Sequence, residues 1–184
     1  EPSSLEYCDP DADGFGVFDL TDANTEISNG LENLVISYHE TEADAENNVN
    51  EIVGEYNNIV AYEQTIFIRV EDSASDNDCS SQLTLTLIVN DVPQINTEPS
   101  SLFLCDENTD GFGIFDLSTS NEELLNGLDP SDFTITYYEA QDDAQNGLNA
   151  IVTPYNYTNT IAFNQFVWVR IENNTTACYN VGSI

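Results

Sequence analysis

The stretch EPSSLEYCDPDADGFGVFDL, residues 1–20, occurs again with few changes as EPSSLFLCDENTDGFGIFDL, residues 98–117. The match continues through ISYHETEADAENNVNEIV and ITYYEAQDDAQNGLNAIV, and it closes with IFIRVE and VWVRIE. Self-similarity over this length indicates a tandem duplication. The sequence therefore predicts two domains of the same fold.

The boundary between the repeats falls in a polar stretch between Pro93 and Pro99. We expect domains at residues 1–93 and 94–184, joined by a short, stiff linker that favours a rod-like arrangement. The final strand of the second repeat is shorter than that of the first, since CYNVGSI aligns with the start of CSSQLTLTLIVN. Such an incomplete edge could be filled by another segment, or by strand donation between subunits into a filament.

Short runs of β-branched and aromatic residues with alternating polarity follow one another along each repeat. Turn residues separate these runs, and this pattern is typical of an all-β sandwich. We expect an Ig-like β-sandwich in each repeat. In the first repeat the expected strands are GVFDL (16–20), LVISYHE (34–40), IVAY (59–62), TIFIRVE (65–71) and QLTLTLIV (82–89).

One short helical cross-over is expected in each repeat, at TEADAENN and AQDDAQNG. Thr41 and Asp44 stand in a capping-box arrangement in the first copy. Ala140 replaces the threonine in the second, so we expect a weaker cap there unless Asp142 or Asp143 compensates. The alternative is a polar cross-over loop without a helix.

The charge balance excludes several classes of function. The chain has 34 acidic residues and two basic ones, Arg69 and Arg170, and its formal net charge is −32. Such a field repels nucleic acids and anionic membranes, and the chain cannot assemble a basic phosphate-binding patch. No apolar run is long enough for a membrane span and no leader precedes the first repeat, so we expect a mature fragment.

The sequence predicts no enzyme. No Ser, His and Asp set recurs in both copies, and the single histidine, His39, lies in a strand pattern where a satisfied structural role is expected. Arg69 and Arg170 each precede a glutamate by two residues, which favours structural ion pairs with Glu71 and Glu172.

Two cysteines stand at matching places in each repeat. Their duplication favours bridges within repeats, Cys8 with Cys79 and Cys105 with Cys178. Disulfides persist in oxidising compartments, so the sequence indicates a periplasmic, surface or secreted protein. A structural zinc site is disfavoured because there is no Cys-x-x-Cys and only one histidine.

The acidic loop after the first cysteine resembles a calcium loop without being an EF-hand. Asp9, Asp11 and Asp13 alternate before Gly14, and this hard-oxygen set suits calcium. The second copy keeps the spacing with one charge fewer. Further ligands are expected from the Phe15 and Phe112 carbonyls, from Asp19 and Asp116, or from a nearby loop. The candidate metal ligands are Asp9, Asp11, Asp13, Phe15 and Asp19 in the first loop, and Asp106, Asn108, Asp110, Phe112 and Asp116 in the second.

Two alternatives remain open for these loops. Asp72, Asp76 and Asp78 could assist the first site whereas only Glu172 could assist the second, so two calcium sites of unequal affinity are expected. In the other interpretation, each loop is an acidic turn whose carboxylates hydrogen-bond their own backbone.

The blocks CDPDADGFGVFDL and VISYHETEADAENNVNEIV resemble the tandem extracellular repeats of large Bacteroidota cell-surface proteins. Those proteins are type IX secreted and gliding-motility-associated, and are similar to adhesins. The resemblance implies an Ig-like module of a long, exported surface chain. It also implies a bacterial O-glycosylation sequon at DSA (72–74), with Ser73 as the acceptor.

These patterns favour a structural function: a calcium-stabilised rigid spacer or filament module of an extracellular adhesin, in contact with neighbouring repeats. The alternative is a calcium-dependent carbohydrate-binding module that contacts surface glycans through exposed tyrosines. Nucleic-acid binding and membrane insertion are not expected. The tyrosines that would decide between the two are Tyr7, Tyr56, Tyr62, Tyr155 and Tyr157.

Overall fold

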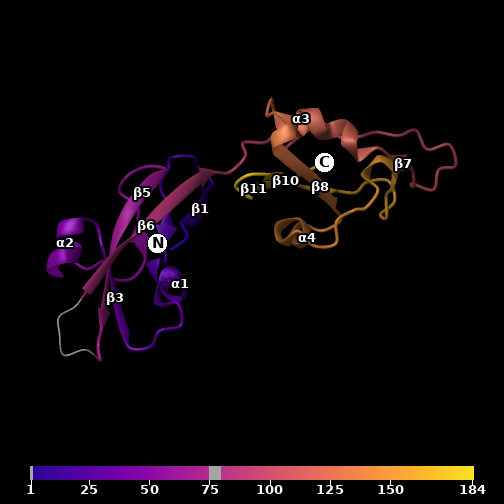
Figure 1. Cartoon of the computed structure of the whole chain (residues 1–184). Coiled ribbons are helices and arrows are strands. Elements are labelled where there is room, and N and C mark those ends of the chain that lie inside the picture. The colour runs from indigo at the N-terminus through magenta and orange to yellow at the C-terminus, as the bar shows by residue number, and fades with distance from the viewer. Residues whose placement is uncertain (1, 75–79) are drawn as a thin grey trace. The chain divides into compact units, whose positions relative to one another are not determined.

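The computed structural model describes residues 2–74 and 80–184, and it divides into two compact units, Glu1–Asp91 and Val92–Ile184 (Figure 1). This division falls two residues before the boundary expected from the prolines. Each unit has its own hydrophobic core. The chain is mostly β and consists of two tandem domains, as the sequence predicted. Among the described residues, no helix is long and apolar enough to cross a membrane.

The main sheet of the first unit has four strands in the order β1-β6-β5-β3. Strand β6 is central: it pairs antiparallel with β5 and parallel with β1. Alternate residues of β5 and β6, Ile66, Ile68, Leu85 and Leu87, are almost completely buried, because period-two alternation places them on one face of the sheet. The strands of this sheet are β1 (Leu5–Asp9), β3 (Leu34–His39), β5 (Glu63–Asp72) and β6 (Ser80–Asp91).

Short helices and a pair of short strands complete the first unit. Where the predicted Ig-like sandwich would have a second full sheet, the structure has two paired strands. The expected strand GVFDL ends at Phe18, because Asp19 caps a 3₁₀ turn in which Leu20 is buried. The predicted strand IVAY is wrong: these residues form a bend. The remaining elements are β2 (Val17–Phe18), η1 (Leu20–Ala23), α1 (Asn24–Ser28), α2 (Glu42–Asn47) and β4 (Tyr56–Asn57).

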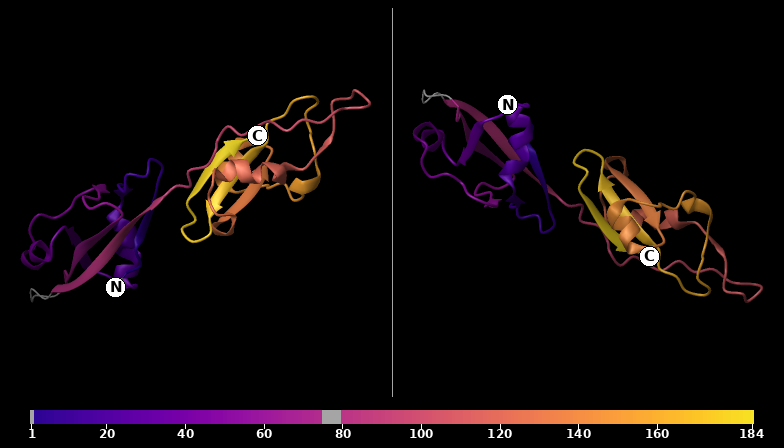
Figure 2. Two further views of the ribbon diagram at one scale, coloured as in Figure 1. Left: turned by 90° about the horizontal axis from the view of Figure 1, so that it is seen from above. Right: turned by 90° about the horizontal axis from the view of Figure 1, so that it is seen from below.

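The second unit repeats this plan with a smaller sheet, ordered β11-β10-β8. The residues equivalent to β1, at 102–106, are not in a strand, and Figure 2 draws this part of the chain as coil in both views. The elements are β7 (Ile114–Phe115), η2 (Leu117–Ser120), α3 (Asn121–Leu125), η3 (Pro130–Asp132), β8 (Phe133–Tyr138), α4 (Gln141–Asn146), η4 (Pro154–Asn156), β9 (Tyr157–Thr158), β10 (Trp168–Asn173) and β11 (Tyr179–Ser183).

Both cross-over helices are present, and their caps differ as the sequence predicts. The Thr41 hydroxyl oxygen accepts the Asp44 main-chain N–H at 3.1 Å and donates to the Asp44 carboxylate at 2.6 Å. Ala140 offers no side-chain cap to α4. Asp143 accepts instead from the Asn149 side chain, so it ties the far end of the helix without capping its start.

Candidate functional site: acidic loops and cysteines

The first acidic loop gathers three carboxylates. One oxygen from each of Asp9, Asp11 and Asp13 lies within 4.8 Å of the other two. Asp9 is fully buried at the end of β1, whereas Asp11 and Asp13 are exposed. The Asp9 carboxylate accepts the main-chain N–H of Asp11 at 3.1 Å and of Gly14 at 2.8 Å, and Asp13 accepts that of Phe15 at 2.9 Å. The carboxylates therefore form Asx turns as well as a cluster of hard oxygen donors.

The three carboxylates perturb one another. Burial raises the pKa of Asp9, but hydrogen bonds from Gly14 and from the side chain of Asp11 outweigh it and bring that pKa below its usual value. The pKa of Asp11 is raised, first by its hydrogen bond with Asp9 and then by the negative charge of Asp13. A divalent cation at this point would offset the negative charge of Asp13, the second of these two causes.

The second loop has the same main-chain hydrogen bonds, and its two carboxylates accept hydrogen bonds from groups of the loop itself. Asp106 accepts the main-chain N–H groups of Asn108 at 3.1 Å, Thr109 at 2.9 Å and Gly111 at 2.7 Å. The Asn108 side chain donates to the Asp110 carboxylate at 2.8 Å. An amide donor thus stands where the first loop has a third carboxylate, and no group of three acidic ligands is found in this loop of the described chain.

The structure does not bring all the predicted ligands into the loops. Asp19 and Asp116 are N-caps of 3₁₀ turns and accept from Thr21 and Ser118. Neither belongs to the acidic cluster found among the described residues. Phe15 and Phe112 lie at the exposed ends of the loops, and their N–H groups donate to Asp13 and Asp110.

The further acidic ligands expected from the loop after β5 or β10 have other hydrogen-bond or ion-pair partners where the structure describes them. Asp72 accepts the Ala74 main-chain N–H, and Glu172 pairs with Arg170. Asp76 and Asp78 lie outside the described residues. The supplementary ligands therefore remain a prediction for the first loop alone.

A buried asparagine fixes each loop, and the sequence analysis missed it. In the first unit Asn58, 4% exposed, accepts the Gly16 N–H at 2.6 Å and donates to the carbonyls of Gly14 at 2.9 Å and Val60 at 2.8 Å. Asn159 makes the same three bonds in the second unit, to Gly113, Gly111 and Ile161. The available signal was the identity of both asparagines in the repeat alignment.

Gly14 has a specific reason to be glycine in this arrangement. Its φ is +82°, in the left-handed region, and an added Cβ would lie 3.0 Å from both Ala61 and Tyr62. Its carbonyl also accepts the Tyr62 main-chain N–H at 2.9 Å. The turn at Gly14 is therefore fixed by contacts with residues 59–62, which the sequence analysis had predicted to be a strand.

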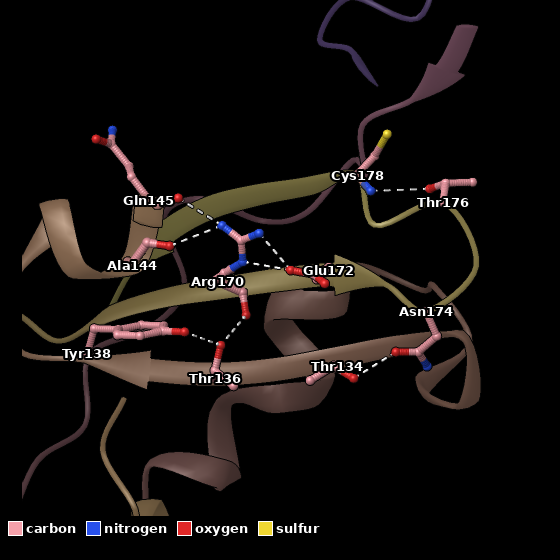
Figure 3. A network of polar contacts seen from close by, with 10 residues as sticks. All are labelled: Thr134, Thr136, Tyr138, Ala144, Gln145, Arg170, Glu172, Asn174, Thr176 and Cys178. Atoms are coloured by element: carbon pink, nitrogen blue, oxygen red, sulfur yellow. Dashed lines mark hydrogen bonds and ion pairs between the residues drawn. The ribbon is translucent and has the colours of Figure 1, made fainter. Parts of the chain in front are cut away.

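Each arginine joins a strand to the cross-over helix, as Figure 3 shows for Arg170. It pairs with Glu172 at 2.6 Å, and its guanidinium donates to the carbonyls of Ala144 and Gln145 at the C-terminal end of α4. Arg69 repeats the arrangement with Glu71 at 2.5 Å. The predicted structural ion pairs are confirmed, and the cations also satisfy helix-terminal carbonyls.

The other singled-out polar residues have structural or surface positions. His39 is buried, with its ring nitrogens hydrogen-bonded to Ser37 and the Val49 carbonyl, so it is a satisfied strand histidine. Ser73, the predicted glycosylation acceptor, is exposed, and its hydroxyl donates to the Asn33 carbonyl at 2.7 Å.

The tyrosines do not form one exposed set. Tyr56 and Tyr157 are each 7% exposed and accept hydrogen bonds from Gln64 and Gln165. Tyr7 is partly buried against the first core. Tyr62 and Tyr155 are exposed, but they belong to different units. This distribution does not favour a stacking surface for a glycan.

The cysteines correct one prediction. Cys8 and Cys178 each take part in a disulfide, whereas Cys105 is exposed and free. The expected bridge between Cys105 and Cys178 is therefore wrong. The expected bridge from Cys8 involves Cys79, which lies outside the described residues. Cys178 is fully buried, and its main-chain N–H donates to the Thr176 hydroxyl at 3.3 Å (Figure 3).

Comparison with known proteins places the chain by its repeats. No curated protein and no solved structure matches it. A family model described as the Flavobacterium inter-domain disulphide bond domain matches twice, at residues 4–93 and 101–184. These two matches cover almost the whole chain and coincide with its two compact units. The chain therefore belongs to the Flavobacterium inter-domain disulphide bond domain family and contains two copies of that domain.

Proposed function

We propose that this chain is a structural segment of an extracellular surface protein, in which disulfides link successive domains and a calcium ion stabilises the first acidic loop. The family description supports a structural module. The proposed role is to limit the movement of consecutive domains relative to one another within a larger adhesin-like chain.

The main support for a disulfide between domains is that one cysteine of the second unit is bonded and the other is free. Cys178 is disulfide-bonded, while Cys105, the other cysteine of that unit, is free. We therefore propose that the partner of Cys178 belongs to the first unit, in line with the family description of an inter-domain bond. The chain has four cysteines, and Cys8 is also bonded. Pairing Cys8 with Cys178 is the assignment that gives both a partner and leaves Cys105 free.

This pairing suggests a scheme for an array. Cys8 and Cys105 occupy equivalent positions in the two repeats. If the cysteine at this position bonds to the following domain, the exposed Cys105 thiol is the group that would bond to the next one. Such links restrict the conformations of the unfolded chain and the freedom of folded domains in the same way as other long-range disulfides.

Peptide mapping without reduction tests the disulfide. Digestion of the oxidised protein should release a linked pair of peptides that carry Cys8 and Cys178, and a thiol reagent should label Cys105 in the native state. Cys8→Ser should remove the linked pair, whereas Cys105→Ser, the matched control, should leave it intact. A linked pair that contains Cys105 and Cys178 would contradict the proposal.

The proposal that the first loop binds calcium is supported by the three clustered carboxylates and by the raised pKa of Asp11. The second loop supplies the matched control, because Asn108 stands at the position of Asp11. We expect calcium to raise the unfolding temperature of the first unit and to have little effect on the second.

An exchange of these two residues tests the site. Asp11→Asn should abolish the calcium effect and stabilise the calcium-free protein, since it removes the repelling charge. Asn108→Asp should create a calcium-dependent increase in the second unit. Thermal unfolding with EDTA and then with calcium measures both. An unchanged calcium response in Asp11→Asn would place the ion elsewhere, and no response in the wild type would remove calcium from the proposal.

The same chemistry supports the proposed extracellular location. Disulfides persist outside the reducing cytoplasm, and the strongly acidic surface favours solubility. Ser73 is exposed and is the proposed O-glycosylation acceptor. Intact mass of the protein from its native source, compared with Ser73→Ala, tests this modification.

A further inference from the structure

In the second unit, a turn after β9 brings the side chains of Thr160 and Gln165 together. The N–H of Asn164 donates to the Ala162 carbonyl at 2.9 Å, and Phe163 has a φ of +68°. This tight turn returns the chain toward β9, and the amide nitrogen of Gln165 donates to the Thr160 hydroxyl oxygen at 3.2 Å. The turn therefore places a hydroxyl group beside a carboxamide.

Two main-chain N–H groups hold the carbonyl oxygen of this carboxamide. The N–H of Thr160 donates to Gln165 Oε1 at 2.6 Å, and the N–H of Ile161 donates to the same atom at 3.0 Å. Paired N–H donors at a carbonyl oxygen stabilise the negative charge that this oxygen takes when a nucleophile adds to the carbonyl carbon. The turn therefore supplies the donors of an oxyanion hole.

A carboxylate and a phenol complete the cluster. The Thr160 hydroxyl donates to one oxygen of Glu139, the residue after β8, at 3.3 Å. The other Glu139 oxygen accepts from the Tyr157 hydroxyl at 3.1 Å, and this hydroxyl accepts from the Gln165 amide nitrogen at 2.7 Å. Burial raises the pKa of Tyr157, so its hydroxyl keeps a proton that it can donate. A base therefore lies at the hydroxyl of Thr160, and a proton donor lies at the amide nitrogen.

The first unit has the same network without the hydroxyl. Gln64 accepts the N–H of Ile59 at 2.7 Å, and its amide nitrogen donates to the Tyr56 hydroxyl at 2.7 Å. The Tyr56 hydroxyl donates to Glu40 at 3.2 Å. Ile59 has the position of Thr160 in the repeat alignment. The turn therefore forms without a hydroxyl at this position, and the second unit adds a nucleophile to it.

We propose that Thr160 and Gln165 form an intramolecular ester bond with release of ammonia. Glu139 takes the hydroxyl proton, and the Thr160 oxygen moves from beside the amide nitrogen to the amide carbon and bonds to it. The electron pair of the C=O bond goes to Oε1, between the two N–H donors, and returns as the C–N bond breaks. The leaving nitrogen takes a proton from Tyr157, which Glu139 restores. One C–O bond thus replaces one C–N bond, and Glu139 and Tyr157 end unchanged.

The ester closes a ring over the turn that holds the second acidic loop. Asn159, directly before Thr160, donates to the carbonyls of Gly111 and Ile161, and the Phe163 N–H also donates to the Gly111 carbonyl. A covalent ring restricts the unfolded chain and opposes local opening of the turn. The reacting groups include no cysteine and no carboxylate of the acidic loops, so the proposal is independent of the disulfide and calcium proposals.

Mass spectrometry of the folded, reduced chain tests the bond. After incubation at neutral pH, the mass should be lower than that of the sequence by one ammonia, and fragment spectra should place the loss in a ring between Thr160 and Gln165. Hydroxylamine cleaves esters, so it should open the ring and leave a hydroxamate on Gln165. Simple deamidation raises the mass, and a succinimide would place the loss at an asparagine, so the fragment spectra distinguish both from the ester.

Matched variants separate the reaction from the fold. Thr160→Ser should keep the loss of ammonia, Thr160→Val should abolish it, and Glu139→Gln should slow it by about a hundredfold or more. Ile59→Thr should add a second loss, at Gln64 of the first unit. Valine is close to the isoleucine that the first unit has at this position, so Thr160→Val should fold, which thermal unfolding checks. A full mass in the wild type, or a ring between residues 160 and 165 that persists in Thr160→Val, would overturn the proposal.

Discussion

The two units have almost the same sequence pattern, but the main sheet has four strands in the first unit and three in the second. In the first unit β6 extends to Asp91 and pairs with β1. In the second unit β11 ends at Ser183, and residues 102–106 are coil. The acidic loop nevertheless keeps its turn in both units, with the same asparagine at its centre. The loop is therefore fixed by its local polar network rather than by the neighbouring strand.

The loops also differ in charge while their geometry is the same. Asp9 and Asp106 both accept the N–H of the glycine five residues later. The pKa of Asp11 is raised by its hydrogen bond with Asp9 and by the charge of Asp13, whereas Asn108 donates to Asp110. The two loops therefore have one shape, and we expect any difference in their metal dependence to come from the additional carboxylate of the first copy.

The largest expected effect is the loss of a buried core side chain of the first unit. Leu87→Ala removes a leucine that is 1% exposed, and such truncations cost about 2–5 kcal/mol. Denaturant unfolding should show the transition of the first unit move to a lower denaturant concentration. Leu31→Ala, at a site 67% exposed, is the control and should change little.

The next effect tests whether the loop network is equally important in both units. Asn58→Ala and Asn159→Ala each leave buried main-chain groups without partners, which costs about 1–3 kcal/mol. We expect similar losses in the two units, measured by chemical denaturation. Asn57→Ala, at the exposed neighbouring position, controls for the composition change. A loss confined to the first unit would mean that the second loop is held in another way.

A smaller effect is expected from exchanging the helix caps. Thr41→Ala should destabilise the first unit by about 1 kcal/mol, because the Asp44 N–H loses its acceptor. Ala140→Thr should stabilise the second unit by a similar amount. Both changes are read from thermal unfolding, and Thr41→Ser should retain most of the wild-type stability. If Ala140→Thr gave no gain, the backbone at α4 would not accept the capping geometry.

The smallest effect is a pH dependence of the second loop. The pKa of Asp106 is lowered, first by the hydrogen bond from Gly111 and then by those from Thr109 and Asn108, against some desolvation. A carboxyl group with a lowered folded-state pKa contributes stability above its unfolded value of about 3.9, and this is lost as the pH falls through the folded value. The stability difference between the wild type and Asp106→Asn should therefore shrink below pH ~4. A difference that stayed constant with pH would contradict this assignment.

Short-range patterns predicted much of the fold. The duplication, the strands β3, β5 and β6, the Thr41 cap and the arginine–glutamate pairs follow from residues two to four positions apart, or from comparison of the two copies. The IVAY strand failed because its polarity pattern does not reveal the bonds of Asn58 to Gly14 and Gly16, residues 44 and 42 positions away.

The sequence by itself determined the two-domain organisation, the alternating core of each sheet and the acidic turns, because local hydrogen bonds and period-two burial depend on near neighbours. Only the tertiary structure decided that Cys105 is free while Cys178 is bonded, and that asparagines hold the loops. It also decided that Leu102, Leu104 and Asp106 line a cavity of the second unit. These features depend on which distant segments meet, and that is set by the packing of the whole domain, which no local pattern encodes.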